Sequence, residues 1–130
     1  MNGDIDQNTD EVGFDFSPAL HMFIGIGEKF PQLKIINIMF TNLTFVGRHA
    51  FEKMDQLQVL VLKFNLIEFL PEDTFWDLRN LNVFRLNGNE IKNIPEKLFE
   101  TMKNLLEVNL ETNHIKFIPE DHVINMHPEE

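Results

Sequence analysis

The amino-acid sequence predicts an α/β right-handed solenoid, shaped like a horseshoe, with one parallel sheet on its concave face and short helical or irregular segments on its convex face. Three observations carry this prediction: a 24-residue period, a polar residue at a fixed place after each expected strand, and apolar residues at fixed later places. Agreement at so many positions over four successive windows is the sequence signature of a repeat architecture. We therefore expect stacked coils.

The period divides the chain into an acidic, polar lead-in, residues 1–8, and a single solenoid domain, residues 9–130. The domain is expected to hold about five coils, at 9–32, 33–56, 57–80, 81–104 and 105–128. The first of these is degenerate, as terminal repeats usually are. With 130 residues, of which 43% are hydrophobic, the chain has enough apolar material for one continuous core.

Each complete window begins with a short expected strand, in which two apolar residues separated by one position mark the buried side. These pairs are Ile36 and Ile38, Leu60 and Leu62, Phe84 and Leu86, and Val108 and Leu110. Side chains alternate across a strand, so the residues beside and between them should face the concave side. The expected concave residues are Ile35, Asn37, Met39, Val59, Val61, Lys63, Val83, Arg85, Asn87, Glu107, Asn109 and Glu111, with Phe40 and Phe64 at the strand exits.

The polar position after each strand is occupied by Thr41, Asn65, Asn89 and Asn113. An asparagine amide both donates and accepts hydrogen bonds, so it can satisfy backbone groups where the chain leaves the sheet. We expect these residues to be structural, and the ladder to be weaker at Thr41.

Later positions of the repeat define the convex side and the interior. Proline at 71, 95 and 119 fixes φ at the start of each convex segment, and the acidic residues that follow it are expected to face solvent. These acids are Glu72, Asp73, Glu96, Glu120 and Asp121. Phe51, Phe75 and Phe99 recur at one apolar position and are expected to form one buried column.

Composition excludes several classes of function. A formal net charge of -10 would repel nucleic acid and anionic lipid surfaces. There is no cysteine, and therefore no disulfide cap, thiol catalysis or thiolate metal site. No apolar run approaches the roughly 20 residues that a membrane-spanning helix needs. We expect neither a nucleic-acid partner nor membrane insertion.

Few residues suggest a catalytic or metal-binding site. Asp4, Asp6, Asn8, Asp10 and Asp15 are spaced like the ligands of a calcium loop, but Thr9 occupies the place that needs glycine. An acidic lead-in is the simpler interpretation, and calcium binding stays open. The five histidines have no metal-binding spacing, and no nucleophile motif is present. We therefore expect no cofactor, no metal and no enzymatic activity.

The repeat, of the form LxxLxLxxNxLxxLPxxxFxxLxx, resembles the leucine-rich-repeat family over residues 9 to about 128. Its length, with proline and phenylalanine at fixed places, is similar to the type found in extracellular animal proteins such as Toll-like receptor ectodomains, Slit and small secreted insect leucine-rich proteins. The resemblance implies a secreted or extracellular protein whose leader is absent from this chain. In that setting the sequon Asn42-Leu43-Thr44 predicts N-glycosylation at Asn42.

The leading functional hypothesis is a non-enzymatic module that binds a protein through the concave face. Its middle is apolar, with Val61 at the centre and expected to point away from the core, while Arg85 and Lys63 are expected to fix the register of the partner. The acidic ends favour a partner that is basic or has an apolar anchor. Two alternatives stay open: β-branched residues simply favour strands, or the chain forms homo-oligomers through the concave patch or its uncapped ends.

Overall fold

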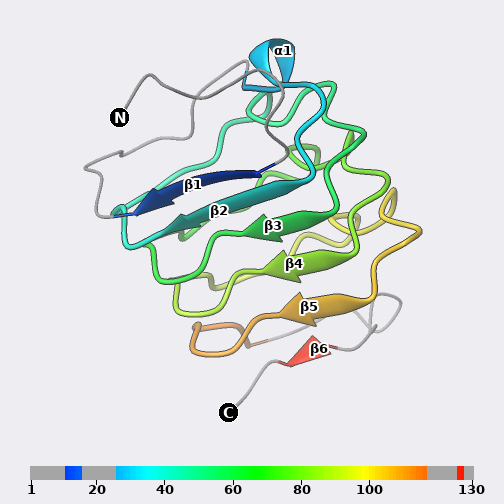
Figure 1. Ribbon diagram of the computed structural model, residues 1–130. Helices are drawn as coiled ribbons and strands as arrows, with labels where there is room; N and C mark the ends of the chain where they lie inside the picture. Colours follow the sequence, from blue (N-terminus) through cyan, green and yellow to red (C-terminus); the bar gives the residue numbers. More distant parts are fainter. Residues whose placement is uncertain (1–10, 16–25, 117–125, 128–130) are drawn as a thin grey trace.

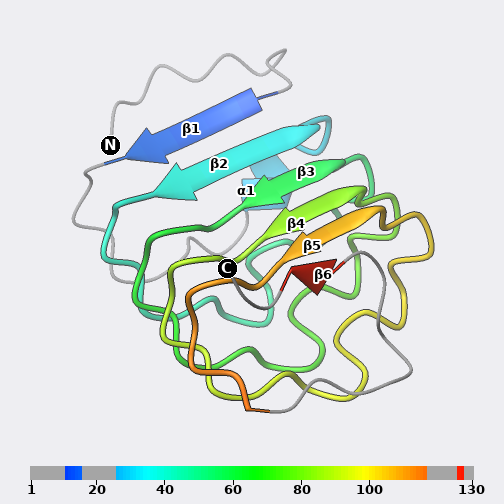
Figure 2. The same ribbon diagram turned by 90° about the horizontal axis from the view of Figure 1, so that it is seen from below.

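The computed structural model describes residues 11–15, 26–116 and 126–127. These contain β1 (Glu11–Asp15), α1 (Ile26–Lys29), β2 (Ile35–Met39), β3 (Val59–Val61), β4 (Val83–Arg85), β5 (Glu107–Asn109) and β6 (Met126–His127). The strands form one sheet in the order β1-β2-β3-β4-β5-β6, and every pair is parallel (Figure 1). Figure 2 shows the strands side by side on one face and the segments that return to the next strand on the other. The solenoid is therefore confirmed.

The register of the sheet follows the repeat. From β1 to β5 every strand pairs with the next at a spacing of 24 residues, as in the series Ile36, Leu60 and Phe84. In β2, β4 and β5 buried residues alternate with half-buried ones. This alternation confirms which side of each strand faces the core, because a shift of one residue would exchange the two faces.

The last strand departs from the period. The sequence places Met126 at an apolar position late in the coil 105–128, but in the structure Met126 pairs with Val108 in the sheet. The chain thus returns to the sheet sooner than a full coil would allow. The outer edge of β5 gains a partner in this way, which removes a row of unpaired backbone groups.

Phenylalanine rings run through the core, but not in the expected order. Phe51, Phe75 and Phe99 are all buried, and the rings of Phe51 and Phe75 stack with centroids 5.6 Å apart. Phe84 of β4 then packs edge-on against Phe75 at 4.9 Å and against Phe99 at 6.3 Å. The column therefore includes a fourth ring. Its presence follows from residue size, since the equivalent strand position carries Leu60 in the preceding coil.

Apart from α1 in the first coil, the described convex segments are tight turns rather than helices. Backbone hydrogen bonds three residues apart close them, for example from the N–H of Ala50 to the carbonyl of Gly47 at 3.2 Å and from Leu98 to Pro95 at 3.1 Å. Glu72 and Glu96 are exposed, as expected. Asp73 is half-buried and lies 3.3 Å from Arg48. Glu120 and Asp121 lie outside the described residues.

The asparagine ladder joins each coil to the one before it. The side-chain oxygen of Asn65 accepts hydrogen bonds from the backbone N–H of Thr41 at 3.0 Å and of Leu43 at 3.2 Å. The amide nitrogen of Asn65 donates to the carbonyls of Ile38 at 3.0 Å and Leu62 at 3.1 Å. One side chain thus satisfies backbone groups in two neighbouring coils.

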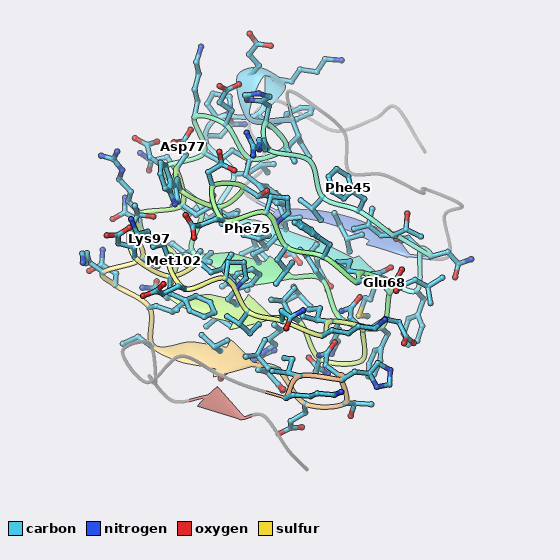
Figure 3. All side chains as sticks on the ribbon, turned by 180° about the vertical axis from the view of Figure 1, so that it is seen from behind. Phe45, Glu68, Phe75, Asp77, Lys97 and Met102 are labelled. Atoms are coloured by element: carbon cyan, nitrogen blue, oxygen red, sulfur yellow. The ribbon has the colours of Figure 1, made fainter. Side chains whose placement is uncertain are left out.

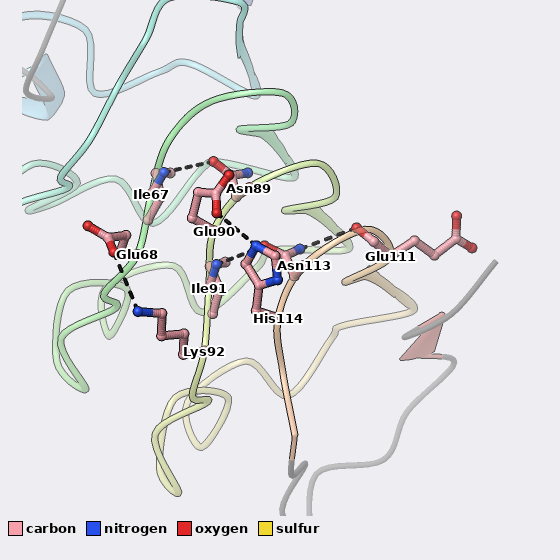
Figure 4. A network of polar contacts seen from close by, with 9 residues as sticks. All are labelled: Ile67, Glu68, Asn89, Glu90, Ile91, Lys92, Glu111, Asn113 and His114. Atoms are coloured by element: carbon pink, nitrogen blue, oxygen red, sulfur yellow. Dashed lines mark hydrogen bonds and ion pairs between the residues drawn. The ribbon is translucent and has the colours of Figure 1, made fainter.

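The same pattern repeats in the following coils. Asn89 accepts from the N–H of Ile67 at 3.1 Å, and Asn113 accepts from the N–H of Ile91 at 3.0 Å (Figure 4). Both amides donate to the carbonyl of Leu86, at 3.0 Å and 2.9 Å. The structural role expected for these asparagines is confirmed. Thr41, at the first of these positions, donates its hydroxyl to Asn65.

A second feature recurs one to three residues after the ends of β2, β3, β4 and β5, where the backbone adopts a left-handed conformation. The φ angles are 58° at Phe40, 57° at Phe64, 73° at Gly88 and 56° at Thr112. The rings of Phe40 and Phe64 stack with centroids 5.0 Å apart. A Cβ atom on Gly88 would lie only 2.4 Å from Cδ1 of Phe64. The stack of Phe40 and Phe64 therefore ends at Gly88, which has no side chain.

We predict that Asn65→Ala destabilises the chain by about 1 to 3 kcal/mol, because the substitution leaves buried backbone groups of two coils without partners. Denaturant midpoints measure the effect. Asn93→Ala is the matched control, since Asn93 is exposed and should change stability by about 0.5 kcal/mol or less. Equal midpoints for the two variants would contradict the role of the ladder.

We also predict that Gly88→Ala costs about 1 to 2 kcal/mol, the penalty for a side chain in the left-handed region. The added methyl would in addition displace the ring of Phe64. Gly47→Ala is the control, because a Cβ there would meet only Phe45, at an ordinary 3.7 Å. Thermal unfolding of both variants tests this, and a Gly88→Ala protein as stable as the Gly47→Ala protein would refute it.

Candidate interaction surface on the sheet

The outward face of the sheet is the surface that we name the concave face, and its side chains form rows across the strands. The first row is Ile35, Val59, Val83 and Glu107, which are register partners on β2 to β5. All four are half-buried. The row therefore presents an apolar stripe over three strands that ends at a carboxylate.

The second row is Asn37, Val61, Arg85 and Asn109. Its central residue corrects an expectation, because Val61 is only 6% exposed although it lies on the outward side of β3. Val61 is short and lies between the longer side chains of Asn37 and Arg85 on the neighbouring strands. A substitution at Val61 would consequently alter a buried site rather than an open surface.

The two cations of this face interact within the chain. Nε of Arg85 lies 2.8 Å from a carboxylate oxygen of Glu107, and Nζ of Lys63 lies 5.7 Å from the ring centroid of Phe64. The Glu111 carboxylate has no ion-pair partner among the described residues. The charge left for an incoming molecule is therefore negative near β5.

Polar groups on the same face retain hydrogen-bonding capacity. The side-chain oxygens of Asn37 and Asn87 are buried and accept no hydrogen bond from the described part of the chain. The oxygen of Asn109, in contrast, accepts from the N–H of Glu111 at 3.0 Å. Met39 completes the outward residues of β2 and is half-buried. Two side-chain oxygens beside the apolar stripe are thus enclosed and have no donor among the described residues.

Of the seven exposed large apolar residues in the described part of the chain, five lie beyond the strands, on the side where the strands end; the other two are Trp76 and Leu106. Phe40 and Phe64, at the strand exits, are 45% and 41% exposed. Phe45, Leu66 and Phe69 follow at 37%, 44% and 55%. Figure 3 shows Phe45 and Glu68 on this side of the molecule, opposite Asp77 and Lys97. Sequence reasoning placed Phe40 and Phe64 at the surface but missed the other three.

The signal that identifies them is a difference between coils. Leu66 occupies a repeat position that carries Glu90 in the next coil, and Phe69 one that carries Asn93. Apolar residues at positions that other coils fill with polar ones mark solvent-facing hydrophobic side chains. Asn42, the residue of the sequon, lies on the same side, is exposed, and has a φ of 57°.

No group of three or more potential metal ligands is found within residues 11–15, 26–116 and 126–127. Of the acidic positions considered for calcium, only Asp15 falls in the described segments, in β1. Asp4, Asp6, Asn8 and Asp10 lie outside them. No helix in the described part of the chain is long and apolar enough to span a bilayer.

Comparison with known proteins identifies a matching family and similar solved structures. The family model "Leucine rich repeat" matches residues 31–91 and 79–127. A chain in the structure of the Toll–Spatzle complex, described for Drosophila, is 32% identical, with a TM-score of 0.76; the match covers 82% of this chain and 14% of that one. The APL1 leucine-rich repeat domain has a TM-score of 0.84 at 23% identity, which shows a shared fold, and the match covers 88% of this chain and 30% of that one.

Among curated proteins, none matches closely enough to count as a relative. The chain spans only a small part of each of the two solved structures named above. The family model, however, covers well over half of the sequence, and the parallel sheet and asparagine ladder follow its repeat. The chain therefore belongs to the leucine-rich-repeat family.

Proposed function

We propose that this chain is a secreted, non-enzymatic module that binds a protein through the concave face of its sheet. Domains of this family are typically protein-binding modules and are generally not catalytic. The observation that carries the proposal is the apolar stripe of Ile35, Val59 and Val83, in register across three strands. Repeat proteins use this extended surface for recognition.

The chemistry of the face indicates the partner. The stripe would receive an apolar anchor, because burying the apolar area that these residues still expose is favourable in proportion to that area. Glu111 favours basic groups at the β5 end, since Arg85 and Glu107 are already paired with each other. The partner is thus a protein segment with an apolar anchor flanked by positive charge.

The similar Drosophila structure is one of a complex, Toll–Spatzle, which supports a protein as the class of ligand. Secretion is proposed from the repeat type. In a secreted protein Asn42 would be the glycosylation site, because it heads the sequon and its side chain makes no hydrogen bond among the described residues.

We predict that Val59→Thr/Val83→Thr weakens partner binding at least tenfold, which corresponds to about 1.4 kcal/mol. Threonine keeps the β-branched shape that strands favour but replaces an apolar methyl by a hydroxyl. The fold should therefore persist, with stability changed by about 1 kcal/mol or less. Val61→Glu would be a poor choice here, because Val61 is buried and the charge would unfold the site.

The measurement is a titration with a purified partner, isolated from extracellular fluid on the immobilised wild-type chain. Glu96→Lys, on the exposed convex side, is the control and should bind normally. Loss of binding in the control, with normal binding in the double variant, would move the interface to the convex side. Light scattering over a concentration series runs in parallel, because homo-oligomerisation through the same face would change the mass of the wild type but not of the double variant.

A further inference from the structure

The side of the solenoid on which the strands end is divided into two chemically different halves. Its first half carries Phe40, Phe45, Phe64, Leu66 and Phe69, which we name the strand-exit patch; each is 37% exposed or more. Phe40 and Phe64 stack, and Phe45 and Phe69 occupy one repeat position in neighbouring coils. Neighbouring coils lie about 4.8 Å apart near the sheet, so these side chains adjoin.

The second half of the same side is polar. In the next two coils Glu90 and His114 occupy the repeat position of Leu66 (Figure 4), and Asn93, next to Lys92, occupies that of Phe45 and Phe69. Phe117, the corresponding residue of the coil 105–128, lies outside the described residues. Glu90 lies 2.8 Å from His114, and Lys92 lies 3.8 Å from Glu68. These exposed pairs are well hydrated and need no cover. The strand-exit patch beside them is expected to be covered, because folded chains rarely leave adjoining large apolar side chains open to water without a binding role.

Asn42 lies within the strand-exit patch. It follows Phe40 by two residues, precedes Phe45 by three, and occupies the repeat position that carries Leu66 in the next coil. The two coils are joined at this point, since the N–H of Leu66 donates to the carbonyl of Leu43 at 2.8 Å. The sequon therefore begins at a residue that lies among the aromatic side chains of the strand-exit patch.

We infer that an oligosaccharide linked to Asn42 covers the strand-exit patch. Attachment joins Nδ2 of Asn42 to C1 of the first N-acetylglucosamine of a lipid-diphosphate-linked donor; the C1–O bond to the diphosphate breaks, the amide loses one proton, and the lipid diphosphate leaves. The C–H faces of pyranose rings carry partial positive charge, which suits the negative faces of aromatic rings. The glycan then shields Phe40, Phe64 and Phe69 while its hydroxyls face water.

This inference rests on the secretion and glycosylation proposed above and adds the place where the glycan lies. It also keeps the two surfaces separate. A glycan folded over the strand exits leaves the stripe of Ile35, Val59 and Val83 open on the sheet. The concave face would therefore stay available to a protein.

The first arm of the test measures attachment. The chain is secreted from animal cells behind a leader, and its intact mass is compared before and after treatment with a peptide N-glycosidase. We expect one glycan, lost in Asn42→Gln and in Thr44→Ala and retained in the conservative Thr44→Ser. An unchanged mass would refute glycosylation, and with it the inference, without bearing on the concave face, whose titration is independent.

The second arm measures how far the glycan shields the strand-exit patch from solvent. Asn42→Gln protein should bind an apolar fluorescent dye several times more strongly than the glycosylated chain, and Phe45→Ser/Phe69→Ser in that background should abolish the excess. The control, Asn42→Gln/Leu106→Thr, creates a sequon at Asn104 on the side where the strands begin. Because Leu106 is itself 62% exposed, the dye binding of this variant is compared before and after enzymatic removal of its glycan, and it should not differ. If Asn42→Gln fails to be secreted, wild type trimmed to a single sugar gives the same comparison.

Equal dye binding with and without the Asn42 glycan would overturn the inference while leaving glycosylation intact. An equal reduction of dye binding by the glycan at Asn104 would also overturn the inference, because it would show a general effect of attached sugar. A glycosylated wild type that dimerises, and loses dimerisation on Phe69→Ser, would assign the patch to a second copy of the chain instead.

Discussion

The rest of this solenoid depends on one constraint: the backbone N–H and carbonyl groups at the strand exits must find hydrogen-bond partners. A coil that leaves the sheet turns its N–H and carbonyl groups inward, where water cannot reach them. Asn65 solves this for two coils at once, because its oxygen accepts from Thr41 and Leu43 while its nitrogen donates to Ile38 and Leu62. Fixing these groups fixes the spacing of the coils. The sheet register and the depth of the core then follow.

What the sequence predicts well is what depends on period and on single-residue chemistry. Asn65 could be assigned because an amide side chain supplies two donors and an acceptor at such a turn, and the two faces of each strand follow from alternation. What it predicts poorly is what depends on neighbouring coils. Val61 faces outward yet is buried by its neighbours, and the ring of Phe84 joins a column that its strand position does not suggest.

The candidate binding surface shows the same limit. The residues of β2, β4 and β5 assigned to the concave face alternate with buried ones as expected. The pairing of Arg85 with Glu107, however, depends on side-chain conformation and could not be read from spacing. Leu66 was overlooked for a different reason, since a residue after the strand belongs to neither face of the sheet. The early return of the chain to the sheet at Met126 also has no signal in the 24-residue pattern.

The contact between Phe64 and Gly88 also bears on how such a protein changes by duplication. In an array of identical units any unit could be copied, removed or exchanged with its neighbour. Here the ring of one coil occupies the space that a side chain of the next would need, so the coils at 57–80 and 81–104 are adapted to their order. Swapping them would place Gly88 beside Phe40 and the ring of Phe64 beside Thr112, whose side chain leaves less room. The unit that can be inherited or transplanted intact is therefore the adjacent pair rather than the single repeat.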